Sequence, residues 1–179
     1  RIAMANKEAI ISAGGIIFDE LRNSGGELIP VDSEHSAIFQ CLMANRGGPS
    51  DVKRILLTAS GGPFYGYSKD MLRDVGTREA LAHPTWKMGP KITVDCATMM
   101  NKGFEIIEAV RLFGVPENKV EVLIHRQSII HSMVEYTDNT VIAQMALPDM
   151  RSCIRFAFSY PDRFDVGEDG IDFASIGAL

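Results

Sequence analysis

The sequence predicts an α/β fold whose second half takes on α+β character. Two observations support this prediction. Short apolar runs alternate with segments of helical periodicity up to about residue 113, which is typical of strand–helix layering with a mostly parallel sheet. Beyond that point, runs of alternating apolar and polar residues follow one another with only short turns between them. This pattern indicates antiparallel strands, and a terminal helix is expected after them.

In the first half, a strand end is expected at the N-terminus, followed by a helix over 7–23 that Gly25 and Gly26 stop. The run ELIPV predicts a short buried strand. A second helix is expected to begin near Ser33, where Ser-Glu supplies an N-cap and an acid in the first turn. The run VKRILLTAS then predicts a strand that ends in a glycine-rich turn.

The second half is expected to begin with an irregular segment, 66–95, that contains one short helix at 77–81. Apolar periodicity predicts a long helix over 96–113. The runs KVEVLIH, SIIHSMVEY and TVIAQMAL have period 2, and the turn signal TDN separates the last two. They are therefore expected to be antiparallel neighbours, and a last helix is expected over 150–160.

The composition is that of a soluble globular protein and argues against two function classes. Hydrophobic residues make up 46% of the 179 residues, and the net charge is −5. A negative chain is unsuited to bind nucleic acid by neutralising phosphates. No apolar run approaches the roughly 20 residues of a membrane helix, so no membrane partner is expected. Cys41, Cys96 and Cys153 lack a C-x-x-C motif and indicate reduced thiols in a cytosol-like compartment.

The motif PVDSEH, residues 30–35, places Asp32 and Glu34 directly after a predicted strand. Ligands of open α/β sheets bind beyond the carboxyl ends of the strands. Two neighbouring carboxylates repel each other unless a cation or proton intervenes, and hard oxygen ligands suit Mg²⁺ or Mn²⁺. A helix N-terminus supported by His35 is the alternative, and for this pair alone it is the commoner arrangement.

The predicted helix that begins at Cys96 carries a polar stripe. Asn101, Lys102 and Glu105 lie three and four residues apart and share one face. Such a trio can supply a third carboxylate to a metal, together with an amide and a cation for an anionic substrate. A solvated polar face is the alternative and the more frequent meaning of such a stripe.

Two glycine- and proline-rich segments carry candidate binding groups. In TASGGPF, residues 58–64, Ser60 and the backbone N–H groups near the glycines can cradle a phosphate, and a tight turn is the alternative. In HPTWKMG, His83 can bind a phosphate and Trp86 can close over a ligand and exclude water. A surface loop whose Trp fills a gap in the core is the alternative there.

Three further basic residues each have two possible roles, as a ligand-binding group or as a structural one. Lys7 in ANKE is either a substrate-binding cation or a lysine at the start of a helix. His125 and His131 lie in strand-like runs and are expected to be packed, hydrogen-bonded histidines.

Taken together, the motifs resemble the 1-deoxy-D-xylulose 5-phosphate reductoisomerase family. The resemblance spans nearly the whole chain, in order and with matching spacing, so the ordered set is far more specific than any single motif. The segments that carry it are ANKE, PVDSEHSAIFQ, LLTASGGPF, HPTWKMGPKITVDCATMMNKGFEIIEA, IHRQSIIHSMVEY and PDMR.

The resemblance implies a homodimeric enzyme that converts 1-deoxy-D-xylulose 5-phosphate to 2-C-methyl-D-erythritol 4-phosphate. It implies NADPH and Mg²⁺, Mn²⁺ or Co²⁺ as cofactors, a role in non-mevalonate isoprenoid biosynthesis, and a location in the bacterial cytoplasm or a plastid stroma. It also implies a division into the end of a dinucleotide-binding domain (1–31), a catalytic domain (32–165) and the start of a linker (166–179). No G-x-G-x-x-G motif follows a predicted strand, so this chain is expected to be an inactive catalytic fragment.

The resemblance further implies roles for individual residues. The metal ligands would be Asp32, Glu34 and Glu105. Substrate contacts would come from Lys7, Ser33, Glu34, Ser60, His83, Cys96, Asn101, Lys102 and Glu105. Catalytic roles would belong to Lys7, Glu34, His83, Trp86, Lys102 and Glu105. NADPH would contact Asn6, Glu8 and Gly89. Met88 would join Trp86 in the closing segment, and Ser128, His131 and Met150 would line the pocket.

Two departures from the family pattern lie near the implied pocket. Cys96 replaces the usual serine, and a thiol is a weak hydrogen-bond donor, so a weaker phosphate contact is expected. The segment MALPDM lacks the glycine that often precedes this proline.

Two other functions are weighed against the reductoisomerase. A non-catalytic fragment that dimerises through its terminal antiparallel strands would show no saturable binding of Mn²⁺ and a phosphonate. Another metal-dependent phosphate-ester enzyme would release phosphate without a nicotinamide cofactor. That function leaves the closing segment with Trp86 and Met88, and the ANKE motif, without a role.

Overall fold

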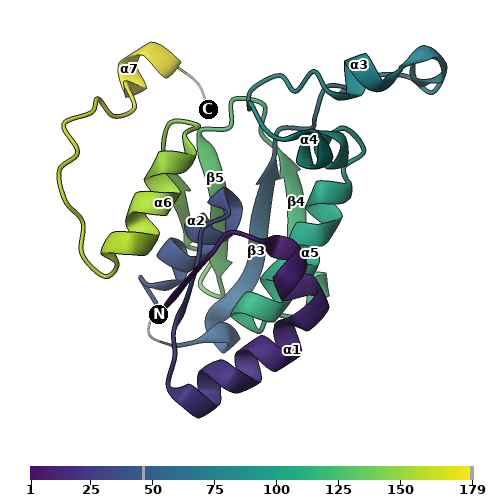
Figure 1. Cartoon of the computed structure of the whole chain (residues 1–179). Coiled ribbons are helices and arrows are strands. Elements are labelled where there is room, and N and C mark those ends of the chain that lie inside the picture. The colour runs from purple at the N-terminus through teal and green to yellow at the C-terminus, as the bar shows by residue number, and fades with distance from the viewer. Residues whose placement is uncertain (46, 178–179) are drawn as a thin grey trace.

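The computed structural model describes residues 1–45 and 47–177. In this part of the chain a mixed four-stranded sheet lies at the centre, with helices packed against it (Figure 1). A separate two-stranded sheet lies next to it. The prediction of an α/β fold with antiparallel strands and a terminal helix in the second half is confirmed.

The chain begins with a β-α-β unit made of β1 (Ile2–Met4), α1 (Lys7–Ser24) and β2 (Leu28–Pro30). The Asn6 side chain caps α1 by accepting a hydrogen bond from the backbone N–H of Ala9, and Gly25 ends the helix with φ of 66°. β1 and β2 are parallel, as a helical crossover requires. The unit delivers Lys7 and Asp32 to the same end of the two strands.

The helix α2 (Ser33–Leu42) follows β2 directly, but its cap differs from the prediction. Asp32 occupies the N-cap position and makes no capping hydrogen bond with its side chain. Ser33 is the first helical residue, and its hydroxyl donates to Glu34 Oε2. The Asp32 carboxylate is therefore free to contact side chains from other elements.

The four-stranded sheet has the order β4-β3-β5-β6. β3 (Val52–Ala59) and β4 (Val120–Ile124) are parallel and joined by a helical crossover, whereas β5 (Ile130–Tyr136) and β6 (Val141–Met145) form an antiparallel hairpin. Two expectations are therefore wrong. β4 is not a neighbour of β5, because β3 lies between them and pairs antiparallel with β5. The first-half strands do not form one parallel sheet.

The predicted helix over 96–113 is two helices, α4 (Pro90–Ala97) and α5 (Met100–Phe113). Pro90 at the first position begins α4 inside the segment predicted to be irregular. Between the helices Met99 adopts a left-handed conformation with φ of 61°, which ends the first helix and redirects the chain. The apolar periodicity runs across this break, which explains why the sequence indicates one helix.

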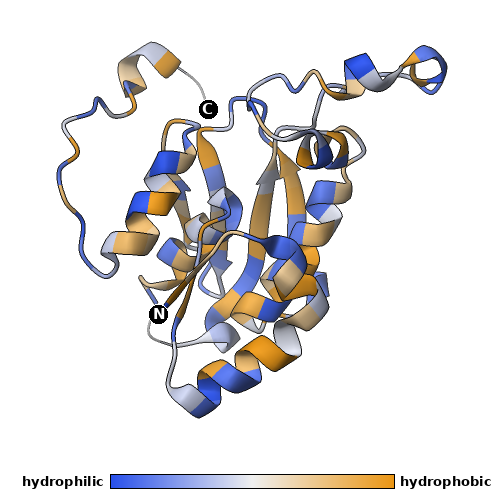
Figure 2. Ribbon diagram, in the orientation of Figure 1, coloured by the Kyte–Doolittle hydropathy of each residue, from blue (hydrophilic) through white to orange (hydrophobic). Residues whose placement is uncertain are grey.

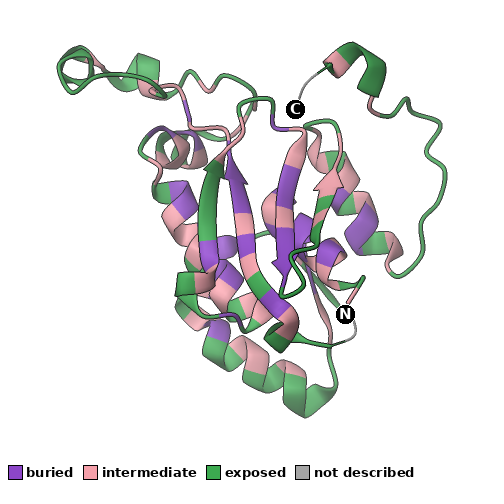
Figure 3. Cartoon of the chain, turned by 180° about the vertical axis from the view of Figure 1, so that it is seen from behind, coloured by how far each residue is buried: buried purple, intermediate pink, exposed green. Residues whose placement is uncertain are grey.

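The core is built between the sheet and the helices α2 and α5. It contains ten buried residues, among them Ile38, Ile55, Leu57 and Val134. In Figure 2 the apolar colour is concentrated on the central strands, and in Figure 3 the buried residues lie along them. Cys41 and Cys153 are buried and, like Cys96, unpaired. The rigid core therefore fixes the carboxyl ends of the strands.

The remaining elements lie around this core. The helix α6 (Met150–Ser159) packs on β2 and α2 through Phe156 and Ala157. Two short helices, α3 (Thr77–Ala80) and α7 (Phe173–Ile176), lie on exposed arms that extend from the body (Figures 1 and 3). Single 3₁₀ turns occupy Pro49–Asp51, Met71–Asp74 and Glu117–Lys119. No helix in the described ranges is both long and apolar enough to span a bilayer.

Candidate active site

A pocket of about 230 Å³ lies at the carboxyl ends of β3 and β4. The two strands are parallel, so Ser60 and His125 follow their ends at the same edge of the sheet. The antiparallel strand β5 enters from that edge with Ile130 and His131. The N-terminal turns of α2 and α5 complete the wall, which is where open α/β sheets bind their ligands.

Three carboxylates from distant parts of the sequence meet in this pocket. Asp32 and Glu34 come from the start of α2, and Glu105 comes from α5. One oxygen of each lies within 4.8 Å of the others. Three hard oxygen ligands with substrate or water in the remaining positions suit an octahedral divalent cation. The donor set therefore fits Mg²⁺ or Mn²⁺.

Two ammonium groups lie among these carboxylates. Lys7 Nζ is 2.6 Å from Asp32 Oδ2 and 3.0 Å from Glu105 Oε1. Lys102 Nζ is 2.7 Å from Glu34 Oε1, and it also contacts Glu105 Oε2 and the carbonyl oxygen of Thr58, each at 2.6 Å. Both lysines are buried, at 6% exposure each. The site therefore alternates positive and negative charge.

The polar stripe of α5 faces the protein interior. Asn101, Lys102 and Glu105 are all buried, whereas Met100 and Ile107 on the opposite side are exposed. The Asn101 side chain accepts from Lys7 Nζ at 2.8 Å and donates to Glu105 Oε1. A solvated polar face is therefore excluded. Charged side chains replace apolar ones on this buried face because they find partners there.

The electrostatics of the site follow from burial and pairing. Burial opposes the charged form of every group, but Asp32 and Glu105 raise the pKa of Lys7, and Lys7 and His35 lower the pKa of Asp32. The pKa of Glu105 is raised by burial and by repulsion from Glu34. A carboxylate disfavoured in this way is stabilised by any cation that enters the site.

The other end of the pocket offers hydrogen-bond donors. His83 Nδ1 accepts from the backbone N–H groups of Thr85 and Trp86 at 3.2 and 2.9 Å, so in the neutral ring Nε2 carries the proton. Nε2 lies 3.0 Å from Ser60 Oγ. Burial and the nearby Arg126 lower the pKa of His83, which keeps the ring neutral.

The segment that contains Trp86 forms part of the pocket wall. Trp86 and Met88 are half-buried and line the pocket, and the Trp86 ring centroid is 6.4 Å from that of His131. Cys96 lines the same wall, where burial raises the pKa of its thiol to about 11. The thiol is therefore neutral and a weak donor.

Three comparisons with known proteins agree with this geometry. The family model described as "1-deoxy-D-xylulose 5-phosphate reductoisomerase C-terminal domain" matches residues 28–113. A 1-deoxy-D-xylulose 5-phosphate reductoisomerase from Acetivibrio thermocellus is 56% identical over 178 residues, which cover 99% of this chain and 46% of that relative.

This chain belongs to the 1-deoxy-D-xylulose 5-phosphate reductoisomerase family.

Solved reductoisomerases have the same fold. The enzyme from Zymomonas mobilis in complex with NADPH superimposes with a TM-score of 0.88 at 46% identity, over 97% of this chain and 44% of that one. A reductoisomerase in complex with NADPH, fosmidomycin and magnesium superimposes with a TM-score of 0.92 at 41% identity, over 100% of this chain and 46% of that one. The chain thus spans about 46% of the length of the reductoisomerases it matches.

All the residues that the reductoisomerase resemblance assigns to metal or substrate line the pocket, together with Ser128, His131 and Met150. The three residues assigned to NADPH lie elsewhere. Asn6 caps α1, Glu8 pairs with Lys91, and Gly89 is the N-cap residue of α4. His131 lines the pocket, and burial lowers its pKa.

Two residues behind the pocket lining were not predicted from the sequence. Glu108 lies one turn beyond Glu105 and is buried beside His35, and the i,i+3 spacing from Glu105 was the available signal. Arg126 donates to the carbonyl oxygens of Ser60 and Gly62 at 2.8 Å each, which fixes the turn after β3. No sequence pattern marks that contact, because it joins two loops.

Proposed function

We propose that this chain is the metal- and substrate-binding part of an NADPH-dependent reductoisomerase. The complete enzyme would convert 1-deoxy-D-xylulose 5-phosphate to 2-C-methyl-D-erythritol 4-phosphate in non-mevalonate isoprenoid biosynthesis. The convergence of Asp32, Glu34 and Glu105 beside a pocket with donors for an anion is the observation that carries this proposal. The reductoisomerase names of the relatives and of the NADPH and magnesium complexes support it.

Asp32, Glu34 and Glu105 would hold Mg²⁺, Mn²⁺ or Co²⁺. The bound cation would supply Lewis-acid polarisation of adjacent substrate oxygens. Lys7 and Lys102 lie next to the same carboxylates and would orient and neutralise oxyanions that develop during rearrangement of the carbon skeleton.

The phosphate would be held at the other end of the pocket, by Ser60, His83, Asn101 and Lys102, with Cys96 beside them. Its binding energy would orient the reacting end of the substrate. Trp86 and Met88 would close over the substrate and exclude water, which otherwise competes for the reacting groups. Ser33 would contact the substrate from the start of α2.

The parts of the reductoisomerase beyond this pocket are inferred from the resemblance. Residues 1–31 would end a dinucleotide-binding domain, 32–165 would form the catalytic domain, and 166–179 would begin a linker; residues 178 and 179 lie outside the described ranges. NADPH would contact Asn6, Glu8 and Gly89. This chain alone would therefore bind the metal but would not oxidise NADPH.

Titration of this chain with Mn²⁺ tests the proposal, with free Mn²⁺ followed by electron paramagnetic resonance. We expect one saturable site in the wild type and loss of that site in Glu105→Gln. Glu117→Gln is the matched control and should bind like the wild type, because this exposed acid precedes the start of β4, at the opposite end of that strand from the pocket. Wild-type binding by Glu105→Gln would remove Glu105 from the site, and phosphate release from the substrate without NADPH would favour a hydrolase.

A further inference from the structure

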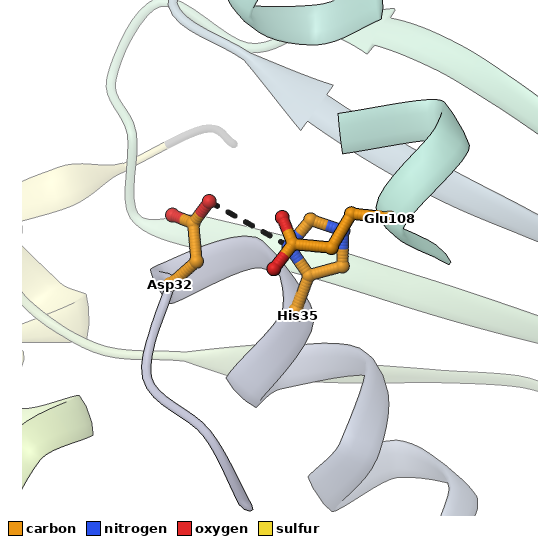
Figure 4. Close-up of side chains that lie close together, drawn as sticks. All are labelled: Asp32, His35 and Glu108. Carbon is orange, nitrogen blue, oxygen red and sulfur yellow. Dashed lines mark ion pairs between the residues drawn. The ribbon is translucent and has the colours of Figure 1, made fainter. Parts of the chain in front are cut away.

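Asp32 also contacts a buried pair of side chains, His35 and Glu108, to which the proposed function assigns no role. His35 on α2 and Glu108 on α5 are buried, at 0% and 1% exposure. His35 Nδ1 lies 3.2 Å from Glu108 Oε2 and 3.6 Å from Asp32 Oδ2. Nδ1 of the imidazole therefore faces both carboxylates, and the three side chains lie close together in Figure 4.

The orientation of the His35 ring is fixed from its other side. Nε2 lies 3.0 Å from the backbone carbonyl oxygen of Glu105, an acceptor that requires a proton on Nε2. The Phe113 ring stacks on the imidazole, with centroids 6.2 Å apart and planes inclined by 15°. Nδ1 therefore points at the two carboxylates and cannot turn away without loss of these contacts.

Glu108 depends on this ring, and Asp32 is oriented by it. Within the described ranges, His35 is the one ion-pair partner of Glu108, and a buried carboxylate without a partner is strongly destabilising. Asp32 makes no capping bond within α2, so its carboxylate is oriented by contacts from other side chains, Lys7 at 2.6 Å and His35. Lys7 also contacts Glu105, so His35, which Glu108 holds from the other element, is the second side chain that orients Asp32.

We propose that Glu108 is a positioning residue that acts through His35 to hold Asp32 in the orientation needed to bind the divalent cation. This inference rests on the proposed function, because it takes Asp32 to be a metal ligand. Groups behind metal ligands orient them, and their removal typically weakens metal affinity about 10–100-fold. Glu108 would thereby belong to the metal site without touching the ion.

The same trio is close enough to bind a cation of its own, since its ligand atoms also lie within 4.8 Å of one another. One observation argues against that use. His35 and Glu108 are enclosed by the core, away from the pocket lining.

Substitutions at position 108 separate positioning from charge. Glu108→Gln keeps a side-chain oxygen next to His35 Nδ1 but loses the charge, whereas Glu108→Leu has a similar size and no oxygen. In Mn²⁺ titrations of this chain we expect Glu108→Leu to bind at least about tenfold more weakly than the wild type. Glu108→Gln should stay within about threefold, and Glu117→Gln should be unchanged. Thermal unfolding followed by circular dichroism shows whether each variant is folded.

Rescue by glutamine is the result that a merely structural role would not produce. Wild-type Mn²⁺ affinity in Glu108→Leu overturns the inference, as does equal weakening in Glu108→Gln. A second Mn²⁺ equivalent in the wild type that Glu108→Leu removes also overturns it, because the trio would then bind a cation itself. If Glu108→Leu does not fold, the double variant His35→Phe/Glu108→Leu takes its place, because it replaces both buried polar groups. This variant should fold and bind Mn²⁺ at least tenfold more weakly than the wild type. Wild-type Mn²⁺ affinity in the double variant overturns the inference.

The failure of the proposed function gives a different result. In that case the wild type shows no saturable Mn²⁺ binding, or Glu105→Gln binds like the wild type, and the inference falls with the function. Normal wild-type binding that is lost in Glu105→Gln but unaffected in Glu108→Leu overturns the inference alone.

Discussion

At the scale of single residues, His83 lines the pocket and accepts hydrogen bonds from the segment that contains Trp86. Its Nδ1 accepts two backbone N–H groups, including that of Trp86, so a proton on Nδ1 removes the acceptor. Because its pKa is lowered on folding, the unfolded chain binds this proton more readily. The stabilisation is therefore complete above the ordinary histidine pKa and is lost as the pH falls through the folded-state value.

Trp86 is the single tryptophan of the chain, which makes this pH dependence measurable. As the pH falls below about 6.5, we expect the emission of Trp86 to shift towards that of exposed tryptophan. His83→Asn places an oxygen near the position of Nδ1 and does not titrate, so its emission should not change with pH. A transition that persists in this variant would assign the titration to His131 instead.

Cys96 provides a second residue-level test. A serine hydroxyl donates a stronger hydrogen bond than the neutral thiol, and one such bond is worth about 1 kcal/mol. Cys96→Ser should therefore bind a phosphonate substrate analogue about three- to tenfold more tightly in calorimetric titrations with Mn²⁺ present. Cys41→Ser, in the core, should change stability but not affinity. Unchanged or weaker binding by Cys96→Ser would argue against a phosphate contact at this position.

The sequence predicts which residues line the pocket better than it predicts their surroundings. Asp32, Glu34 and Glu105 lie in motifs with a recognisable spacing, and all three line the pocket. Burial of the polar stripe of α5 could not be predicted, because the same pattern is typical of a solvated face. The contact of Glu108 with His35 depends on the approach of α2 to α5, a tertiary distance that periodicity does not contain.

At the scale of elements, the turn after β3 determines how closely α4 approaches the sheet. Gly62 has φ of 65°, and a Cβ there would lie 2.6 Å from the carbonyl oxygen of Cys96. Gly62→Ala combines backbone strain with a clash that shifts α4, so we expect a loss of at least about 2 kcal/mol in the free energy of unfolding. Urea denaturation measures this value.

Gly48→Ala is the matched control for the Gly62 variant. Gly48 has a similar φ of 81°, but a Cβ there meets no atom of the described residues within 4 Å. The backbone strain alone should cost about 1 kcal/mol. Equal losses in the two variants would show that α4 does not pack tightly against this turn.

The positions of the strands and helices follow from the sequence more reliably than the order of the strands. The period-2 runs at β4, β5 and β6 are correctly located, because alternating apolar and polar residues are typical of strands. Their pairing is not local: β3, about 65 residues earlier in the chain, inserts between β4 and β5. The break between α4 and α5 at Met99 likewise could not be predicted, because no residue type in the sequence marks a left-handed conformation there.

At the scale of the whole molecule, the edge strand β6 is the surface through which we expect two copies to pair. Its outer edge has no strand partner among the described residues, and Val141 on it is 47% exposed. Val141→Lys should shift the molar mass from light scattering from dimer towards monomer. Val122→Lys, on the opposite edge strand β4 and 40% exposed, is the control and should leave the mass unchanged. A monomeric wild type, or equal effects of the two variants, would contradict pairing through β6.

The two lysines among the carboxylates would also couple the binding of a cation to the binding of an anion in this pocket. A divalent ion held by Asp32, Glu34 and Glu105 would take over the counter-charges of Lys7 and Lys102, whose ammonium groups would then be available to an incoming anion. Under the proposed function, the ion would therefore bind first and the sugar phosphate second.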